Sequence, residues 1–210
     1  YKKKKHRFTS MIGQEYVYNW NKYLEASASN FPNDDIGLND LSLGATPGIP
    51  RSYVNFDDKL LSFFARVNYN YEEKYILSAS VRADGSSKFG EKNKWGIFPS
   101  ISGAWRMSEE KFIKNLNIFS DLKLKGGYGL AGNNRISNYL SLPILGSVTY
   151  PQGTTTKSGY ASTQIPNPFL KWEANKTFNL GLDIGLLKQR LIIIPEFYNN
   201  RSSSLLLNSR

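Results

Sequence analysis

Apolar and polar residues alternate with a period of two over long stretches of this chain. From Leu61 to Tyr71 every second residue is apolar or aromatic, and most of the residues between them are polar. The alternation resumes from Tyr75 to Ala83, after the short polar segment 72–74. Because the side chains of a β-strand point alternately to opposite faces, the pattern predicts a hairpin with one apolar and one polar face.

The same alternation predicts more strands along the chain. The clearest is 171–186, where only Lys176 interrupts the apolar positions. A strand of this length spans about 50 Å, far more than an ordinary globular strand. Pro195 removes a hydrogen-bond donor, so it predicts a sheet edge or a bulge. The further expected strands are 95–107 and 122–130, with weaker patterns at 7–23 and 190–200.

The expected connections alternate between short and long. Two are tight turns, at 72–74 and 187–190, and 108–120 is intermediate, with Ser108 as the expected N-cap of a helical turn. The long polar connections are 24–58, 84–94 and 131–170. Long loops at one end of a sheet and short turns at the other are typical of outer-membrane barrels.

Aromatic residues gather at both ends of the expected strands. Tyr69, Tyr71 and Tyr75 lie at the short-turn end, and Trp95 and Trp172 lie beside the long connections. Membrane barrels carry such rings at the two lipid interfaces. The fold expected for residues 1–210 is therefore all-β, a segment of an antiparallel up-and-down transmembrane β-barrel with long extracellular loops and short periplasmic turns.

A soluble β-sandwich is the alternative, because its strands also alternate. In that case the chain would be a carbohydrate-binding module. Its stacking platforms would be Trp20, Trp95 or Trp172.

Composition excludes several kinds of chemistry. The chain has no Cys and a single His, so thiol catalysis and cysteine or multi-histidine metal sites are excluded. Its net charge is +10, but the one dense basic run, 2–7, lacks interleaved aromatic residues, so no nucleic-acid partner is expected. We expect no enzymatic activity, no catalytic residues, no metal and no cofactor.

Three motifs favour ordinary structural roles. Residues 127–132 match G-x-G-x-x-G, but no amphipathic helix follows to bind a phosphate. The acidic loop 33–40 lacks regular calcium-ligand spacing. His6, next to a run of lysines, is a poor base for a serine triad.

In these segments the chain resembles the SusC/RagA-type TonB-dependent transporters of the bacterial outer membrane. The resemblance covers nearly the whole chain. It is carried by residues 62–71 (SFFARVNYNY), 82–90 (RADGSSKFG), 95–100 (WGIFPS), 104–106 (AWR), 108–110 (SEE), 122–134 (LKLKGGYGLAGNN), 167–173 (NPFLKWE) and 179–183 (NLGLD).

The resemblance implies a 22-stranded barrel with an N-terminal plug, a SusD-like surface lipoprotein, and import of a glycan or peptide powered by the TonB complex. This chain shows no plug and does not end in an aromatic residue, so we expect an internal piece of the barrel, about a third of its strands, in the outer membrane of a Bacteroidetes-type Gram-negative cell.

In such a barrel the apolar positions would face outer-membrane lipid and the polar positions would face the lumen. The expected lumen-lining residues are Arg66, Asn68, Arg82, Arg106, Lys123, Glu173 and Asn175. The residues expected to contact substrate or lid from the loops are Phe31, Tyr53, Tyr150 and Tyr160.

Overall fold

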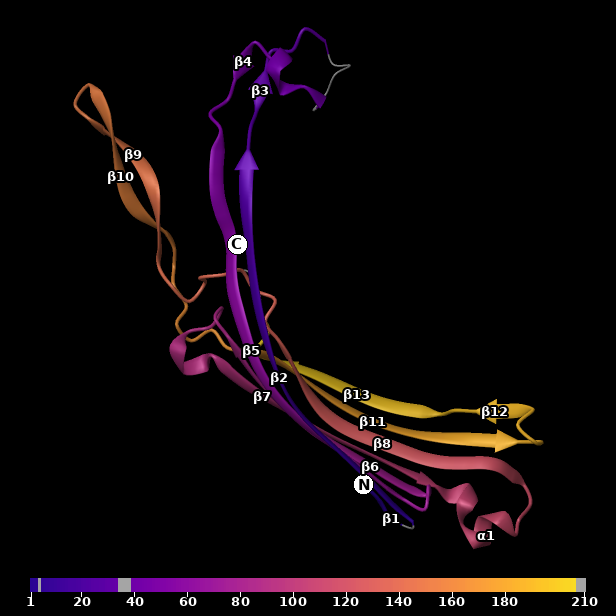
Figure 1. Cartoon of the computed structure of the whole chain (residues 1–210). Helices are drawn as coiled ribbons and strands as arrows, with labels where there is room; N and C mark the ends of the chain where they lie inside the picture. The colour runs from indigo at the N-terminus through magenta and orange to yellow at the C-terminus, as the bar shows by residue number, and fades with distance from the viewer. Residues whose placement is uncertain (4, 34–38, 207–210) are drawn as a thin grey trace. The chain divides into compact units, whose positions relative to one another are not determined.

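Antiparallel sheet dominates the chain, as the alternation predicts (Figure 1). The computed structural model describes residues 1–3, 5–33 and 39–206, and at Lys2, Lys3 and 55–57 it describes the backbone alone. The strands of the main sheet are β1 (Lys2–Lys3), β2 (His6–Glu25), β5 (Arg51–Tyr71), β6 (Tyr75–Ser86), β7 (Trp95–Arg106), β8 (Phe119–Asn133), β11 (Glu173–Leu186), β12 (Leu191–Ile193) and β13 (Glu196–Ser203).

These strands follow one another in the sheet almost in chain order. The order is β1-β2-β5-β6-β7-β8-β11, and both β12 and β13 pair with β11. Neighbours in sequence are thus neighbours in space, which is an up-and-down arrangement. Residues 17–59 form a compact unit of their own, and residues 1–16 and 60–210 form another.

Smaller elements occupy the connections. A short pair, β3 (Ala28–Ser29) and β4 (Thr46–Pro47), lies between β2 and β5, and a hairpin of β9 (Ile144–Gln152) and β10 (Thr155–Gln164) lies between β8 and β11. The helical turns are η2 (Leu41–Leu43), η3 (Glu91–Asn93), η4 (Met107–Glu109) and α1 (Lys111–Lys114). Within the described ranges, no helix has the length and apolar character needed to cross a membrane.

The strand register separates two chemically different faces. Directly paired residues share a face, and Val67 pairs with Ala79, which pairs with Ile101, whereas Arg66 pairs with Ser80 on the other side. The apolar face therefore carries the large aliphatic and aromatic side chains, and the polar face carries the charged and hydroxyl groups, as the sequence predicts.

The apolar face is exposed rather than packed. Phe63 is 49% exposed, Leu77 46% and Phe197 59%, and among the described residues only Phe89, Phe98 and Leu122 are buried hydrophobic residues. A soluble sandwich would cover this face with a second large sheet, whereas the further sheets in the described ranges are the two-stranded pairs β3–β4 and β9–β10, and the apolar face is exposed. The sandwich alternative is therefore wrong.

Several boundary predictions need correction. The connection predicted at 24–58 is shorter, because β2 and β5 extend as paired strands to Glu25 and from Arg51. The region 131–170, predicted to be loop, contains the β9–β10 hairpin. Residues 34–38 of the acidic loop lie outside the described residues.

Local predictions had mixed outcomes. Ser108 does not cap a helix, because it lies inside η4 and its hydroxyl donates to Asp121 at 3.1 Å. Pro195 interrupts the last strand between β12 and β13, as predicted. Residues 127–132 all lie within β8, which continues to Asn133 without a following helix, so the G-x-G-x-x-G match is accidental.

Candidate functional site

The polar face of the sheet carries most of the candidate residues, and its charges form ion pairs across strands. Arg82 of β6 donates to Glu15 of β2 at 2.6 Å, to Asp84 of its own strand at 2.6 Å and to Ser62 of β5 at 2.8 Å. The guanidinium group also lies 5.5 Å from the ring centre of Phe64. Arg82 is thus on the predicted face, but its Nε and Nη2 groups already donate to residues of the sheet itself.

A second ion-pair cluster lies across β8, β11 and β13. Asp183 pairs with Lys123 at 3.4 Å and with Lys125 at 2.9 Å, and Lys125 also pairs with Glu196 at 2.7 Å. Gly181 makes room for this arrangement, because a Cβ there would come within 2.7 Å of Lys125 Cε. The charges of the four side chains cancel, so this part of the wall is polar without a net charge.

Between the two clusters the polar face is neutral and lined by small residues. Ser78 donates to Asn68 Oδ1 at 2.8 Å, and the hydroxyls of Ser80 and Ser100 lie 2.8 Å apart. Ser102 pairs with Gly127 across β7 and β8. This part of the wall offers hydrogen-bonding groups without large side chains.

The other predicted lumen residues also lie on this face. Arg106 pairs in register with Lys123, and its guanidinium lies 4.0 Å from Glu109. Glu173 accepts from Asn133 at 3.3 Å, and Asn175 accepts from Ser202 at 2.5 Å. Arg66 is exposed and forms no ion pair within the described part of the chain. The seven candidates thus share one face, and their contact with a passing substrate remains a prediction.

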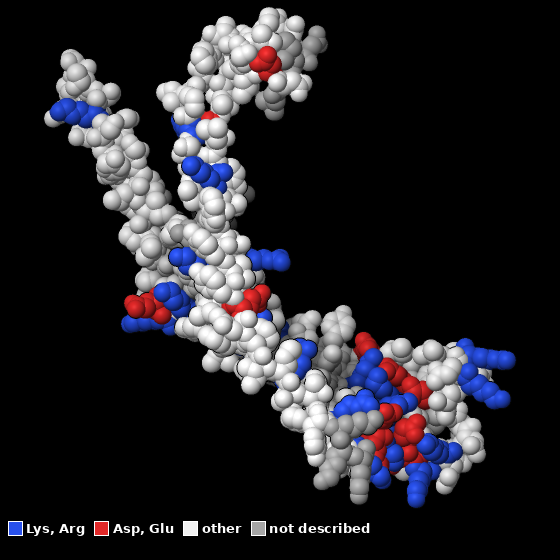
Figure 2. Space-filling model, viewed as in Figure 1, with Lys and Arg blue, Asp and Glu red and all other residues white. Residues whose placement is uncertain are grey.

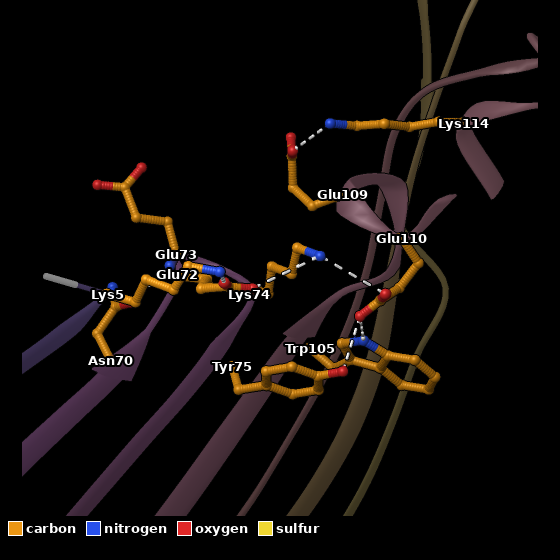
Figure 3. A network of polar contacts seen from close by, with 10 residues as sticks. All are labelled: Lys5, Asn70, Glu72, Glu73, Lys74, Tyr75, Trp105, Glu109, Glu110 and Lys114. Atoms are coloured by element: carbon orange, nitrogen blue, oxygen red, sulfur yellow. Dashed lines mark hydrogen bonds and ion pairs between the residues drawn. The ribbon is translucent and has the colours of Figure 1, made fainter. Parts of the chain in front are cut away.

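A polar network closes the short-turn end of the sheet (Figure 3). The Glu110 carboxylate accepts from Tyr75 at 2.7 Å and from Trp105 at 3.3 Å, and Lys74 lies 3.6 Å away. Lys74 also lies 3.8 Å from Glu72, which forms an ion pair with Lys5. The network connects the β5–β6 turn to the β7–β8 connection.

These contacts change the acidity of the carboxyl groups. Hydrogen bonds from Tyr75 and Trp105 are the main cause that lowers the pKa of Glu110 below its ordinary value. The hydrogen bond from Lys5 lowers the pKa of Glu72, and the same contact raises the pKa of Lys5. Both acids are therefore held in their charged form.

Aromatic rings follow the same end of the sheet on its apolar face. The ring centres of Tyr71 and Tyr75 lie 6.2 Å apart, as do those of Tyr75 and Trp105, and the latter two rings are tilted by only 14°. His6 continues the row at 4.8 Å from Tyr71. At the opposite end Trp95 stacks on Phe63 with ring centres 6.2 Å apart. Rings at both ends of the apolar face agree with the predicted placement.

Trp172 is an exception to this placement. It precedes β11 and packs on Phe89 and Phe98, with ring centres 5.1 Å and 5.3 Å away. Its indole N–H donates to the Lys94 carbonyl at 3.0 Å. Trp172 therefore anchors the end of the β10–β11 connection to the β6–β7 loop and does not lie on the apolar face, which corrects the prediction.

The loop candidates lie in two different connections. Tyr150 and Tyr160 belong to the β9–β10 hairpin, where Tyr150 pairs with Lys157 and Tyr160 with Ser147, so their side chains point to opposite faces. Tyr160 is 79% exposed. Tyr53 stacks on Tyr23 with ring centres 5.5 Å apart, and Phe31 lies against Gly44 near η2.

Gln164 closes the base of the hairpin. Its side-chain amide donates to the carbonyl of Tyr139 at 2.9 Å and to that of Leu142 at 3.0 Å. Sequence reasoning missed Gln164, Glu15 and Phe98, because their roles depend on partners far away along the chain. In the described ranges no group of His, Cys, Asp and Glu is arranged to hold a metal ion.

An antiparallel sheet with an exposed apolar face, a polar face and rings at both ends defines the wall of a transmembrane β-barrel. Comparison with known families agrees. The TonB dependent receptor-like β-barrel family matches residues 3–209, and the chain belongs to this family.

Individual relatives support the assignment. TonB-dependent receptor P3 of Formosa agariphila is 36% identical over 201 residues, which cover 96% of this chain and 20% of the relative. TonB-dependent receptor SusC of Bacteroides thetaiotaomicron is 39% identical over 155 residues, 70% of this chain and 15% of the relative. The chain thus spans about a fifth of the length of the first curated relatives it matches.

A solved structure agrees in fold. The structure of the RagAB peptide transporter matches with a TM-score of 0.83 and 32% identity, over 99% of this chain and 23% of that chain. The RagAB peptide importer in its 'open-open' state matches with a TM-score of 0.79 over 94% of this chain. The SusC/RagA-type resemblance drawn from the motifs is therefore confirmed.

Proposed function

We propose that this chain forms part of the barrel wall of a TonB-dependent importer in the Gram-negative outer membrane. The main observation that supports this proposal is the division of one sheet into an exposed apolar face and an ion-paired polar face. The apolar face contacts lipid, and the polar face lines the lumen through which a nutrient passes. The turns at 72–74 and 187–190 lie on the periplasmic side, and the long connections lie on the extracellular side.

The proposed substrate is a glycan or a peptide, and the proposed partners are a SusD-like lipoprotein outside the cell and the TonB complex in the periplasm. The similarity to the RagAB peptide importer supports a peptide as one of these two substrate classes. Exposed aromatic groups such as Tyr160 suit contacts with either substrate or lid.

The β9–β10 hairpin offers the sharpest test. Residues 145–163 are replaced by a two-residue turn in the full-length receptor, which leaves Gln164 and both flanking strands intact. Uptake of labelled peptides and oligosaccharides is measured together with the amount of receptor at the cell surface. The proposal predicts reduced uptake or a changed substrate range at an unchanged surface level.

The matched control changes the other side of the membrane. Glu73→Gln alters an exposed turn residue without removing backbone structure. Uptake should be unaffected by this variant. If Glu73→Gln changed substrate choice while loss of the hairpin did nothing, the assignment of the two sides would be wrong.

A further inference from the structure

An open groove of about 910 Å³ lies between the β7–β8 connection and the β11–β12 turn. Ile118, Phe119 and Leu187 form its apolar part, and Glu109, Lys114 and Lys188 line its polar part. Two connections far apart in the sequence therefore contribute to one groove, with apolar and cationic groups side by side.

The connections around this groove expose large apolar side chains. Leu187 is 69% exposed and Ile118 58%, and Phe112 and Leu116 of the same β7–β8 connection are 60% and 52% exposed. Turns in water are normally polar, so such exposure indicates an apolar partner. Leu187 directly follows Leu186, the last residue of β11, whose side chain belongs to the apolar face.

The aromatic row fixes the level of these side chains relative to a membrane. Tyr75 and Trp105 lie on the apolar face, and their polar tips donate to Glu110 (Figure 3). Tyr and Trp take this orientation at the boundary between hydrocarbon and headgroups. Glu110 immediately precedes α1, so the connection that forms one wall of the groove begins at the headgroup level.

The side chains that line the groove carry a net positive charge, with Lys114 and Lys188 against Glu109. Lys114 forms an ion pair of 2.7 Å with Glu109, which offsets that carboxylate. Lys188 forms no ion pair among the described residues, and Lys111 and Arg190 belong to the same two connections. In Figure 2, Lys and Arg side chains gather together with Asp and Glu side chains at the end of the sheet that carries α1.

We propose that this groove binds an anionic phospholipid of the periplasmic leaflet. The phosphate lies between Lys114 and Lys188, and the part of the acyl chains next to the headgroup lies on Ile118, Phe119 and Leu187. The inference rests on the proposed membrane function, because it requires the short-turn end to lie at the periplasmic surface. Its partner is a lipid and not a protein, because Leu186 of the apolar face lines the groove together with exposed apolar side chains, at the end of the sheet that carries the aromatic row.

Lipid retention by the purified full-length receptor tests the proposal. The receptor is stripped of lipid in detergent and titrated with phosphatidylglycerol or with phosphatidylcholine, and bound lipid is counted by native mass spectrometry. Lys114→Gln/Lys188→Gln should weaken phosphatidylglycerol binding about tenfold, since each cation near an anionic headgroup contributes to affinity. Lys188→Gln alone is a second variant, which removes one cation of the groove and leaves the ion pair between Lys114 and Glu109 intact.

Lys92→Gln/Lys157→Gln is the matched control, because both lysines are exposed and lie in connections at the other end of the strands. It should bind phosphatidylglycerol as the unchanged receptor does. Equal affinity in the groove variants and the unchanged receptor would overturn the proposal. So would competition by glycerol 3-phosphate as strong as that by the lipid, since the site would then bind a small anion.

The measurement is independent of transport. A receptor that binds phosphatidylglycerol in this groove but imports nothing would contradict the proposed transport function and leave the lipid site standing. A receptor that imports normally and shows no preference for phosphatidylglycerol would contradict only the lipid site.

Discussion

The hydroxyl of Tyr75 donates a 2.7 Å hydrogen bond to Glu110, a residue that lies beyond the end of the next strand. The indole N–H of Trp105 reaches the same carboxylate oxygen at 3.3 Å. One acidic side chain thus fixes two rings of the apolar face and, through Lys74, the turn between β5 and β6. The polar network and the aromatic row at this end of the sheet are therefore a single structural unit.

This unit predicts a pH-dependent contribution to stability. The pKa of Glu110 is lowered from its ordinary value of 4.5, so its charged form stabilises the folded receptor above that pH, and the contribution is lost as the pH falls through the lowered pKa. Glu110→Gln keeps an acceptor for Tyr75 and Trp105 but has no charge for Lys74. Thermal unfolding in detergent should show a less stable variant at pH 7.

The difference in thermal stability between Glu110→Gln and the unchanged receptor should then shrink as the medium is acidified below pH 4.5. Comparing variant with unchanged receptor at each pH removes the effect of all other carboxyl groups. A difference that is constant from pH 7 to pH 3 would show that the charge of Glu110 contributes nothing.

Arg82 and Arg66 both lie on the polar face, but we expect Arg82 to be structural and Arg66 to be free of structural contacts. Arg82→Ala leaves Asp84, which is only 8% exposed, without its cation, and we expect a loss of about 1–3 kcal/mol in unfolding free energy. Arg66→Ala removes an exposed side chain that forms no ion pair within the described residues, so stability should change by less than about 0.5 kcal/mol. Urea unfolding from micelles measures both, and equal losses would refute the distinction.

In transport, unlike in stability, we expect Arg66 to matter more than Arg82. Its guanidinium forms no ion pair within the described residues and would be free to contact the proposed substrate. The Nε and Nη2 groups of Arg82 already donate to Asp84, Glu15 and Ser62. Arg66→Ala should therefore change uptake of anionic substrates more than that of neutral ones.

The period-two pattern was sufficient to predict the main strands and the division of the sheet into two faces. That success has a local cause, because the side chains of a strand alternate whatever the distant partners are. The tight turns at 72–74 and 187–190 were also predictable from the short polar breaks between strands.

What the sequence could not supply depends on pairing at a distance. Nothing near Glu15 indicates that it will meet Arg82 of another strand, and nothing near Gln164 indicates two distant carbonyl groups. The β9–β10 hairpin was missed because Ser, Thr and Gly dominate 144–164. The signal available in the sequence was Gly153 followed by a Thr-rich stretch. In the structure Gly153 has a φ of 63° in the turn of the hairpin.

Val67 and Asn68 test which face meets lipid. They are consecutive in β5 and point to opposite faces. Val67→Arg places a charge on the apolar face, which costs about 2–4 kcal/mol near the bilayer midplane, so the amount of receptor in the outer membrane should fall. Asn68→Arg places the same charge on the polar face and should insert normally. The face assignment fails if the Asn68 variant is the one that is lost.

Gln164 should control the order of the β9–β10 hairpin. Gln164→Ala removes two hydrogen bonds, each contributing about 1 kcal/mol at most at this exposed site. Faster hydrogen exchange is expected in 144–164 with no change in β8 and β11. Gln152→Ala is the control, because its side chain lies at the tip of the hairpin, away from the clamp.

Two strand glycines allow a test of the aromatic anchor around Trp172. A Cβ at Gly132 would overlap the ring of Phe98, which is buried against Trp172, whereas the nearest atom to a Cβ at Gly103 is 3.8 Å away. Gly132→Ala must displace Phe98 and should cost about 1–3 kcal/mol. Gly103→Ala should be neutral or slightly stabilising, because alanine loses less chain entropy on folding. Proteolysis of the β10–β11 connection should increase only in the Gly132 variant, and equal behaviour of the two would mean that Phe98 does not anchor this connection.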